Sequence, residues 1–167
     1  MQKYRKTVIC DGASFIGIRS LPEPVILLTF IVMIKVEHIG IAVNNLAASI
    51  ELYEKLLGSP CYKTESVVSE QVNTAFFRQG ETKIELLESA DPGGVIARYL
   101  EKRGEGIHHI AFEVADIEAE MARLSAEGFT LLSGSPRPGA DNKWVCFLHP
   151  RDTGGILVEL CMERKES

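Results

Sequence analysis

The sequence lacks a paired-cysteine motif and a hydrophobic run long enough to cross a bilayer. Its four cysteines, Cys10, Cys61, Cys146 and Cys161, have no C-x-x-C spacing. This scatter favours reduced thiols in a cytoplasmic protein over a disulfide framework. The apolar run VILLTFIVMIKV, residues 25–36, has about half the length that a membrane-spanning helix needs. We therefore expect a cytoplasmic protein with no membrane partner.

An excess of positive charge is also missing. The formal net charge is -5 and the isoelectric point is near 5.4, so no nucleic-acid partner is expected. A phosphate-binding G-x-x-x-x-G-K-[ST] loop is absent too. Any anionic ligand must then be held by individual side chains.

Residues 1–32 differ in composition from the rest of the chain. A basic start, MQKYRK, is followed by the Gly- and Pro-containing stretch GASFIGIRSLPEP. This stretch interrupts the order of charge, apolar core and cleavage site that a signal peptide has. We expect an extension upstream of the true start, with an edge strand plus tail as the alternative. The predicted domain covers residues 33–163.

The remainder of the chain repeats itself. EHIGIAVNNLAASIELYEKLLG (37–58) aligns with HHIAFEVADIEAEMARLSAEGF (108–129), and each copy reads as a strand followed by a helix. Asn45 and Asp116 are good N-cap residues for the two helices, and Gly58 and Gly128 mark their ends. β-rich hairpin patterns follow each helix, at 71–88 and 143–160.

This pattern predicts an α+β fold of two paired βαβββ modules, residues 34–90 and 105–163. A linker at 91–104, with a helix at about 93–103, joins them. Duplicated modules that pair with each other give a curved mixed sheet around a cleft.

Four polar residues occupy matched places in the two copies. His38 and His109 head equivalent strands, and Glu85 and Glu159 lie at the centres of equivalent later strands. One pseudo-symmetry operation would bring them to a common centre. Two imidazoles and two carboxylates suit an octahedral divalent cation with two open positions, such as Co²⁺, Mn²⁺, Ni²⁺, Zn²⁺ or Mg²⁺. The alternative for each residue alone is a strand-edge His or a solvated Glu.

Strand alternation predicts what surrounds these histidines. His38 shares a face with Gly40, and His109 shares a face with Ala111, which leaves room for a ligand over the imidazoles. His108 is expected on the opposite face, in a structural role. His149 is also expected to be structural, with substrate contact as the alternative.

The segments EHIGIAVNNLAASIELYEKLLG, FFRQGETKIELLE, IARYLEKRGEGIHHIAFEV and FLHPRDTGGILVEL resemble methylmalonyl-CoA epimerases of the vicinal oxygen chelate (glyoxalase/bleomycin resistance/dioxygenase) superfamily. The resemblance runs from Ile34 to Cys161. It implies a homodimeric isomerase that interconverts the stereoisomers of methylmalonyl-CoA by a 1,1-proton shift through a metal-stabilised enolate. The implied metal ligands are the four residues above, and the substrate is an acyl-CoA thioester.

The resemblance also implies catalytic bases. Glu159 is one candidate. A family member carries a second acidic residue on the strand matching VNTAFF, where this chain has Asn73 and Thr74. Glu70 is then the nearest carboxylate and a candidate second base, with an exposed loop glutamate as its alternative reading and a metal-bound water or a residue outside this pattern as the alternative base. Lys143 and Arg151, in loops near the substrate, are candidate substrate-binding residues, with solvated turn cations as the alternative.

Two other functions compete. A glyoxalase I-like lactoylglutathione lyase would use the same four ligands. A drug-binding protein of this fold would keep the cleft without the metal ligands. An iron dioxygenase fits less well, because Glu85 would fill a position that oxygen or substrate needs.

Overall fold

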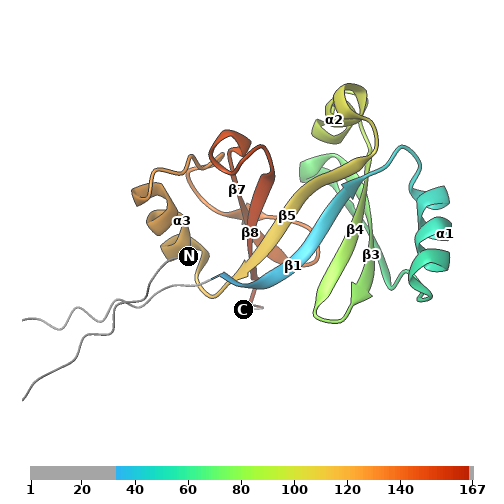
Figure 1. Cartoon of the computed structure of the whole chain (residues 1–167), viewed down its shortest axis with the longest axis horizontal. Coiled ribbons are helices and arrows are strands. Elements are labelled where there is room, and N and C mark those ends of the chain that lie inside the picture. Colours follow the sequence, from blue (N-terminus) through green and yellow to red (C-terminus); the bar gives the residue numbers. More distant parts are fainter. Residues whose placement is uncertain (1–32, 166–167) are drawn as a thin grey trace, which may run out of the picture.

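Eight strands within the described part of the chain form one curved mixed sheet. The computed structural model describes residues 33–165, which include three α-helices besides the sheet (Figure 1). Cys10 and the predicted extension at 1–32 lie outside the described residues. Within 33–165, none of the helices has the length and apolarity that crossing a bilayer requires.

The two predicted βαβββ modules follow each other along the chain. The first comprises β1 (Met33–Ala42), α1 (Leu46–Leu57), β2 (Lys63–Val67), the 3-10 turn η1 (Val68–Glu70), β3 (Val72–Gln79) and β4 (Thr82–Ser89). After α2 (Val95–Arg103), the second comprises β5 (Gly106–Val114), α3 (Ile117–Ala126), β6 (Arg137–Pro138), β7 (Lys143–Leu148), η2 (Pro150–Asp152) and β8 (Leu157–Glu163). The predicted fold class is thus confirmed.

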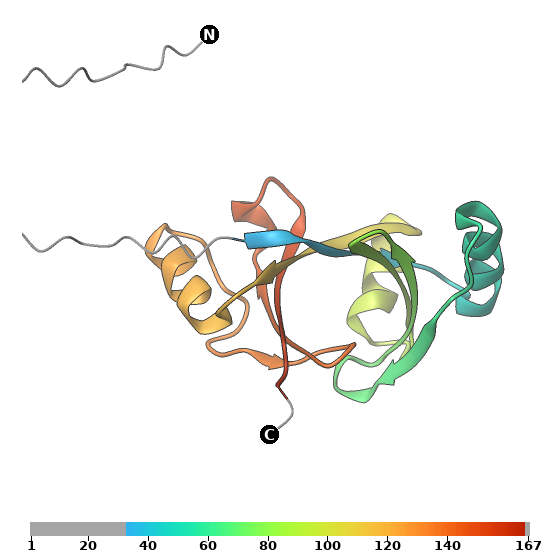
Figure 2. The same ribbon diagram turned by 90° about the horizontal axis from the view of Figure 1, so that it is seen from below.

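The sheet is symmetric about its centre. Its strand order is β2-β3-β4-β1-β5-β8-β7-β6. β1 and β5 pair antiparallel in the middle, while β4 runs parallel to β1 and β8 runs parallel to β5. Viewed from below, the sheet curls round so that its two ends approach each other (Figure 2). The four strands nearest the centre therefore line the deepest part of the concave face.

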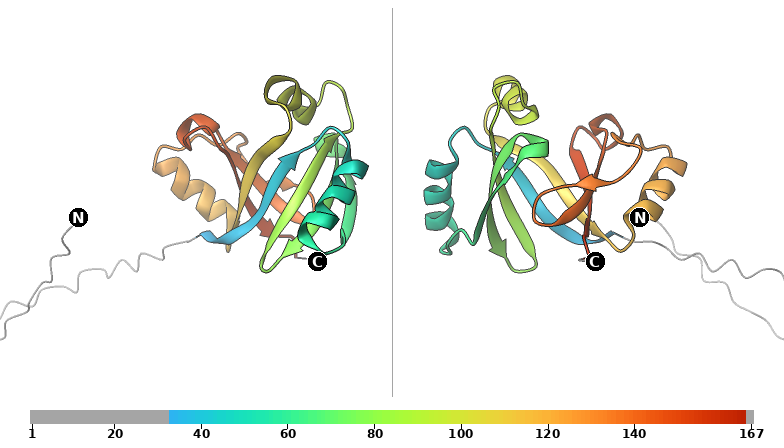
Figure 3. Two further views of the ribbon diagram at one scale, coloured as in Figure 1. Left: turned by 45° about the vertical axis from the view of Figure 1, so that its right-hand side comes forward. Right: turned by 180° about the vertical axis from the view of Figure 1, so that it is seen from behind.

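Helices α1 and α3 cover the convex face, at opposite ends of the molecule (Figure 3). Both begin at the predicted caps: the side chain of Asn45 accepts from the backbone N–H of Ala48, and that of Asp116 accepts from Ala119. α1 packs on a cluster around Phe77 and Leu86, and α3 contributes to a cluster with Leu148 and Leu160. These apolar residues alternate along the strands with residues of the concave face.

Candidate functional site

Two rows of directly paired residues cross the centre of the concave face. Each row holds a glutamate, a small residue and a histidine on three adjacent strands: Glu85, Gly40 and His109 on β4, β1 and β5, and Glu159, Ala111 and His38 on β8, β5 and β1. The small residue in the middle of each row lets the long side chains on either side reach over it. Each row therefore joins a glutamate of one module to a histidine of the other, so that the duplication gives two equivalent His–Glu rows side by side.

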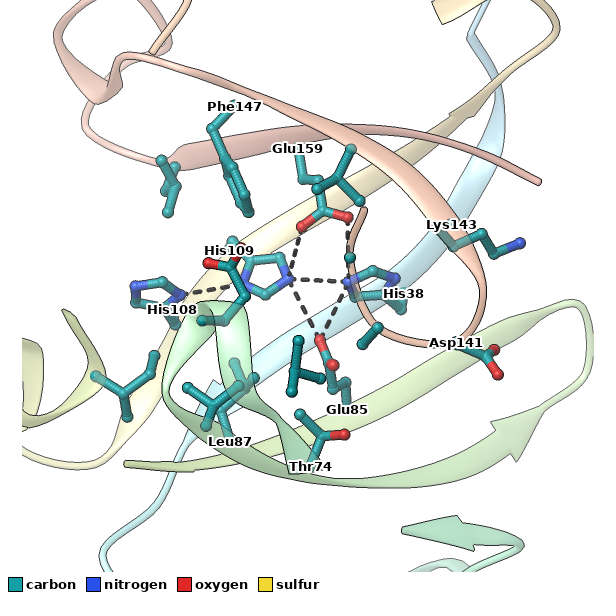
Figure 4. Close-up of a pocket in the computed structure, with 18 of the residues that line it drawn as sticks. His38, Thr74, Glu85, Leu87, His108, His109, Asp141, Lys143, Phe147 and Glu159 are labelled. Atoms are coloured by element: carbon teal, nitrogen blue, oxygen red, sulfur yellow. Dashed lines mark hydrogen bonds and ion pairs between the residues drawn. The ribbon is translucent and has the colours of Figure 1, made fainter. Parts of the chain in front are cut away.

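The four side chains converge on one point (Figure 4). His38 Nε2 lies 2.9 Å from His109 Nε2, with the two rings nearly perpendicular at 86°. Glu85 Oε2 lies 3.3 Å from His38 Nε2 and 3.5 Å from His109 Nε2. Glu159 lies 3.6 Å from His109 Nε2 and 3.9 Å from His38 Nε2. All four residues are buried, so the structure brings the predicted quartet together.

The donor set fits a divalent cation. Bonds of about 2.1 Å put neighbouring ligand atoms of an octahedron about 3.0 Å apart, which matches the 2.9 Å between the two imidazole nitrogens. His38, His109 and Glu159 each offer a ligand atom within 4.8 Å of the others. Neutral imidazoles and carboxylates suit a hard or borderline cation.

The electrostatics of the quartet favour positive charge at its centre. Burial alone would lower the pKa of His38, but the carboxylates of Glu85, Glu37 and Glu159 raise it to about 9. Burial would raise the pKa of Glu85, yet the nearby imidazoles lower it below its usual range. Burial raises the pKa of Glu159, which the histidines only partly oppose. A bound cation would supply the positive charge that protonated His38 otherwise provides.

The expected position of His108 on the opposite face is wrong. In the β1–β5 register Gly40 pairs with His109 and Ile41 pairs with Ile107, so His108 is the extra residue of a β-bulge. A bulge breaks the alternation and turns neighbouring side chains towards one face. His108 Nδ1 lies 3.0 Å from His109 Nδ1, and burial together with His109 lowers the pKa of His108 to about 4. Its imidazole is therefore neutral near pH 7.

The space expected above Gly40 is also used differently. A Cβ atom built on Gly40 would lie 2.2 Å from His109 Cε1. The missing side chain therefore makes room for the imidazole of His109, not for a ligand.

A cavity of about 210 Å³ opens over the quartet. Among the described residues, eight polar or charged ones are buried, and seven of these line the cavity, a set that includes Glu37, Lys143 and Thr74 besides the quartet. Leu87, Val145 and Phe147 contribute to apolar walls. Such a mixture of apolar walls and a few convergent polar groups is typical of a small-molecule site.

Of the remaining predicted site residues, two line the cavity and one does not. Glu70 lines the cavity and forms an ion pair with Arg137, which also lines it. Lys143 is buried in the lining, with its Nζ 3.3 Å from Glu37 Oε1 and a further contact to Glu163. The side chain of Arg151 is 65% exposed, contacts Asp152, and is not part of the lining.

Three residues of the site were missed or misplaced by sequence reasoning. Glu37 directly precedes His38 and contacts its ring, Arg137 faces Glu70, and His108 joins the quartet's face. The repeat aligns residue 37 with residue 108. That both side chains face the cavity follows only from the bulges in the β1–β5 register. His149 accepts a hydrogen bond from the Arg151 backbone N–H and is absent from the cavity lining.

Comparisons with known proteins agree on one family. A family model described as the Glyoxalase/Bleomycin resistance protein/Dioxygenase superfamily matches residues 37–147. The ethylmalonyl-CoA/methylmalonyl-CoA epimerase of Cereibacter sphaeroides is 42% identical over 128 residues, covering 75% of this chain and 96% of that protein.

Solved structures give the same result. The methylmalonyl-CoA epimerase of Mycobacterium tuberculosis superimposes with a TM-score of 0.75 at 34% identity, covering 78% of this chain and 88% of that one. A Streptomyces coelicolor methylmalonyl-CoA epimerase variant in complex with 2-nitronate-propionyl-CoA has a TM-score of 0.74 at 34% identity, with coverages of 80% and 97%.

Proposed function

Because this chain belongs to the glyoxalase/bleomycin resistance/dioxygenase superfamily, we propose that its cavity is the active site of a methylmalonyl-CoA epimerase that requires a divalent cation. The observation that carries the proposal is the pair of imidazole nitrogens 2.9 Å apart, faced by two buried carboxylates. Relatives that are 34% to 42% identical over most of this chain and carry this activity in their names support the substrate.

His38, Glu85, His109 and Glu159 would hold the cation. When bound, it supplies positive charge that stabilises the negative charge developing on the substrate as the proton leaves C2. The apolar walls around the quartet exclude water, which strengthens these charge interactions. The physiological metal is open among Co²⁺, Mn²⁺, Ni²⁺, Zn²⁺ and Mg²⁺.

Inversion at C2 needs one proton acceptor and one proton donor on opposite faces of the substrate. Glu159 is the proposed residue on one face: the C2–H bond breaks, its electron pair stays on the substrate, and the proton passes to the Glu159 carboxylate. A carboxylate that holds a cation is a weak base, so Glu159 would take the proton once its carboxylate has shifted off the metal. Glu70 is the proposed residue on the other face: it begins this direction protonated, its O–H bond breaks as the proton passes to C2, and proton exchange with solvent then restores both carboxyl groups. In the reverse direction the two exchange roles.

The acyl part of the substrate would occupy the cavity, and the CoA arm would extend outside it. A volume of about 210 Å³ is below the usual range for a whole drug-sized ligand, as expected if only the malonyl part is enclosed. Lys143 in the lining and Arg151 on the surface are the proposed substrate-binding residues. Guanidinium and ammonium groups are the usual partners of carboxylates and phosphates. A homodimer and a cytoplasmic location remain predictions.

A comparison of two substrates tests the function. The purified chain, stripped of metal and reconstituted with each cation in turn, is given a single C2 stereoisomer of methylmalonyl-CoA, and the stereoisomer ratio is followed over time. The expected result is metal-dependent approach to a mixture, with little turnover of the methylglyoxal–glutathione adduct. Turnover of that adduct alone would assign the chain to the lactoylglutathione lyases. If the wild-type protein binds no metal and does not invert C2 of methylmalonyl-CoA, the result would favour the alternative of a small-molecule-binding protein.

A further inference from the structure

Glu37 is a buried carboxylate that belongs to neither the proposed ligands nor the proposed bases. It is only 3% exposed. In the β1–β5 register Val36 pairs with Phe112 and His38 pairs with Ala111, so Glu37 is the extra residue of a bulge in β1. The bulge turns Glu37 towards the same face as His38. A charged group is rarely buried without partners that compensate its desolvation, so those partners indicate what it does.

The two oxygens of Glu37 have different partners. Oε1 lies 2.5 Å from Lys83 Nζ on β4 and 3.3 Å from Lys143 Nζ on β7. Oε2 lies 2.6 Å from His38 Nδ1. Strands from both modules thus fix the carboxylate, and its second oxygen contacts the imidazole.

Ion pairing alone does not account for this arrangement. Lys83 has a second carboxylate partner in Asp141, at 2.6 Å, and Lys143 has one in Glu163. The contact of Oε2 with His38 Nδ1 leaves the other ring nitrogen, Nε2, directed at His109 Nε2 and Glu85 Oε2. The equivalent bulge residue in the second module, His108, also contacts Nδ1 of the histidine that follows it, through its own Nδ1 at 3.0 Å.

We propose that Glu37 is a positioning residue for the metal centre: its Oε2 accepts the Nδ1–H of His38 and thereby fixes the ring so that Nε2 is the ligand atom. The role rests on the proposed function, because it requires a cation at the quartet. A carboxylate bonded to the far nitrogen of a ligand histidine sets its tautomer and orientation and makes the ligand nitrogen more basic. Lys83 and Lys143 hold the carboxylate in place for this purpose.

Replacing Glu37 should weaken metal binding. The test measures Co²⁺ affinity of the metal-free full-length chain by titration calorimetry for wild type, Glu37→Gln and Glu65→Gln. Glu65 is the matched control. It pairs with Lys63 Nζ at 2.8 Å, and Lys63 is joined through Asp141 to Lys83, the partner of Glu37. No contact between Glu65 and His38 is found among the described residues. Glu37→Gln is expected to lower Co²⁺ affinity about 10- to 100-fold and to change the visible absorption spectrum of bound Co²⁺. Glu65→Gln should leave both nearly unchanged.

The outcomes separate the two proposals. Equal Co²⁺ affinity in Glu37→Gln and Glu65→Gln, alongside tight binding by wild type, would overturn the positioning role and leave the proposed function intact. A wild-type chain that binds no divalent cation would overturn both. A ¹⁵N NMR spectrum of the Zn²⁺-loaded wild-type chain serves if the variant does not fold. It should show His38 with hydrogen on Nδ1 and metal on Nε2, and the reverse assignment would contradict the role.

Discussion

Gly40 on β1 lies directly across from His109 on β5, and the imidazole of His109 occupies the space that a side chain at residue 40 would fill. The position of the His109 imidazole therefore depends on residue 40 having no side chain. A single added methyl group reaches the centre of the site without changing any charge.

Gly40→Ala is therefore expected to displace His109 and weaken metal binding at least about 10-fold. The new Cβ would lie 2.2 Å from His109 Cε1, and overpacking of this kind costs about 1–3 kcal/mol. Isothermal titration with Co²⁺ checks the affinity. Gly134→Ala is the control, since nothing lies within 4 Å of a Cβ there. Equal affinity in both variants would show that His109 is not held by this contact.

Glu159→Gln and Glu85→Gln make the same chemical change at equivalent positions of the two modules. Loss of the proposed base Glu159 should reduce turnover about 100-fold or more, while Glu85→Gln keeps an amide oxygen as a ligand and should lose less. Because burial raises the pKa of Glu159 in the metal-free protein, a neutral amide there should change the free energy of unfolding of that protein little. Steady-state kinetics and chemical denaturation measure the two effects. Equal kinetic losses would remove the distinction between ligand and base.

Glu70→Gln tests the second proton-transfer residue. Without Glu70, Glu159 can still remove a proton from one stereoisomer and return one to the same face. Exchange of the C2 hydrogen with solvent should thus persist for that stereoisomer, while inversion falls about 100-fold. Chiral analysis of the product, combined with its deuterium content, distinguishes the two processes. Glu81→Gln, at an exposed turn, is the control, and normal inversion by Glu70→Gln would exclude its role.

Asp141 forms ion pairs that link the two modules, and these pairs should make the free energy of unfolding depend on pH in the acidic range. Its carboxylate lies 2.6 Å from Lys83 Nζ and 2.9 Å from Lys63 Nζ. Burial would raise its pKa, but the lysines lower it below the ordinary 3.8. A lowered folded-state pKa stabilises the fold above the unfolded-state pKa, and this contribution is lost as the pH falls through the folded-state value.

Asp141→Asn should therefore cost about 1–2 kcal/mol at pH 7, since solvent partly screens the pairs. The difference from wild type should shrink as the pH falls below about 4. Urea unfolding across this pH range measures it. A difference that stays constant with pH would mean that the amide acts through packing and not through lost charge.

Much of the fold and the core of the site followed from the internal repeat. Matching His38 with His109 and Glu85 with Glu159 sufficed to predict one centre, because equivalent residues of paired modules must be related by the same rotation. The caps at Asn45 and Asp116 were equally readable, since capping depends on local sequence.

The bulges could not be predicted in this way. Alternation assigns Glu37 and His108 to the outer face, and only the β1–β5 register shows that each is an extra residue turned inward. Register depends on contacts between strands about 70 residues apart, so the sequence of either strand alone does not contain it. The pairing of Asp141 with Lys63 and Lys83 was missed for a similar reason, because it forms only when the sheet curls.

The central claim is proton exchange at C2 of an acyl-CoA thioester inside this quartet. Methylmalonyl-CoA is incubated in D₂O with the metal-loaded chain, and mass spectrometry follows deuterium at C2. One deuterium per molecule is the predicted result; it should be absent with metal-free protein and, for the stereoisomer whose C2 proton Glu159 removes, with Glu159→Gln. Inversion or binding of the substrate with no deuterium gained at C2 would contradict it.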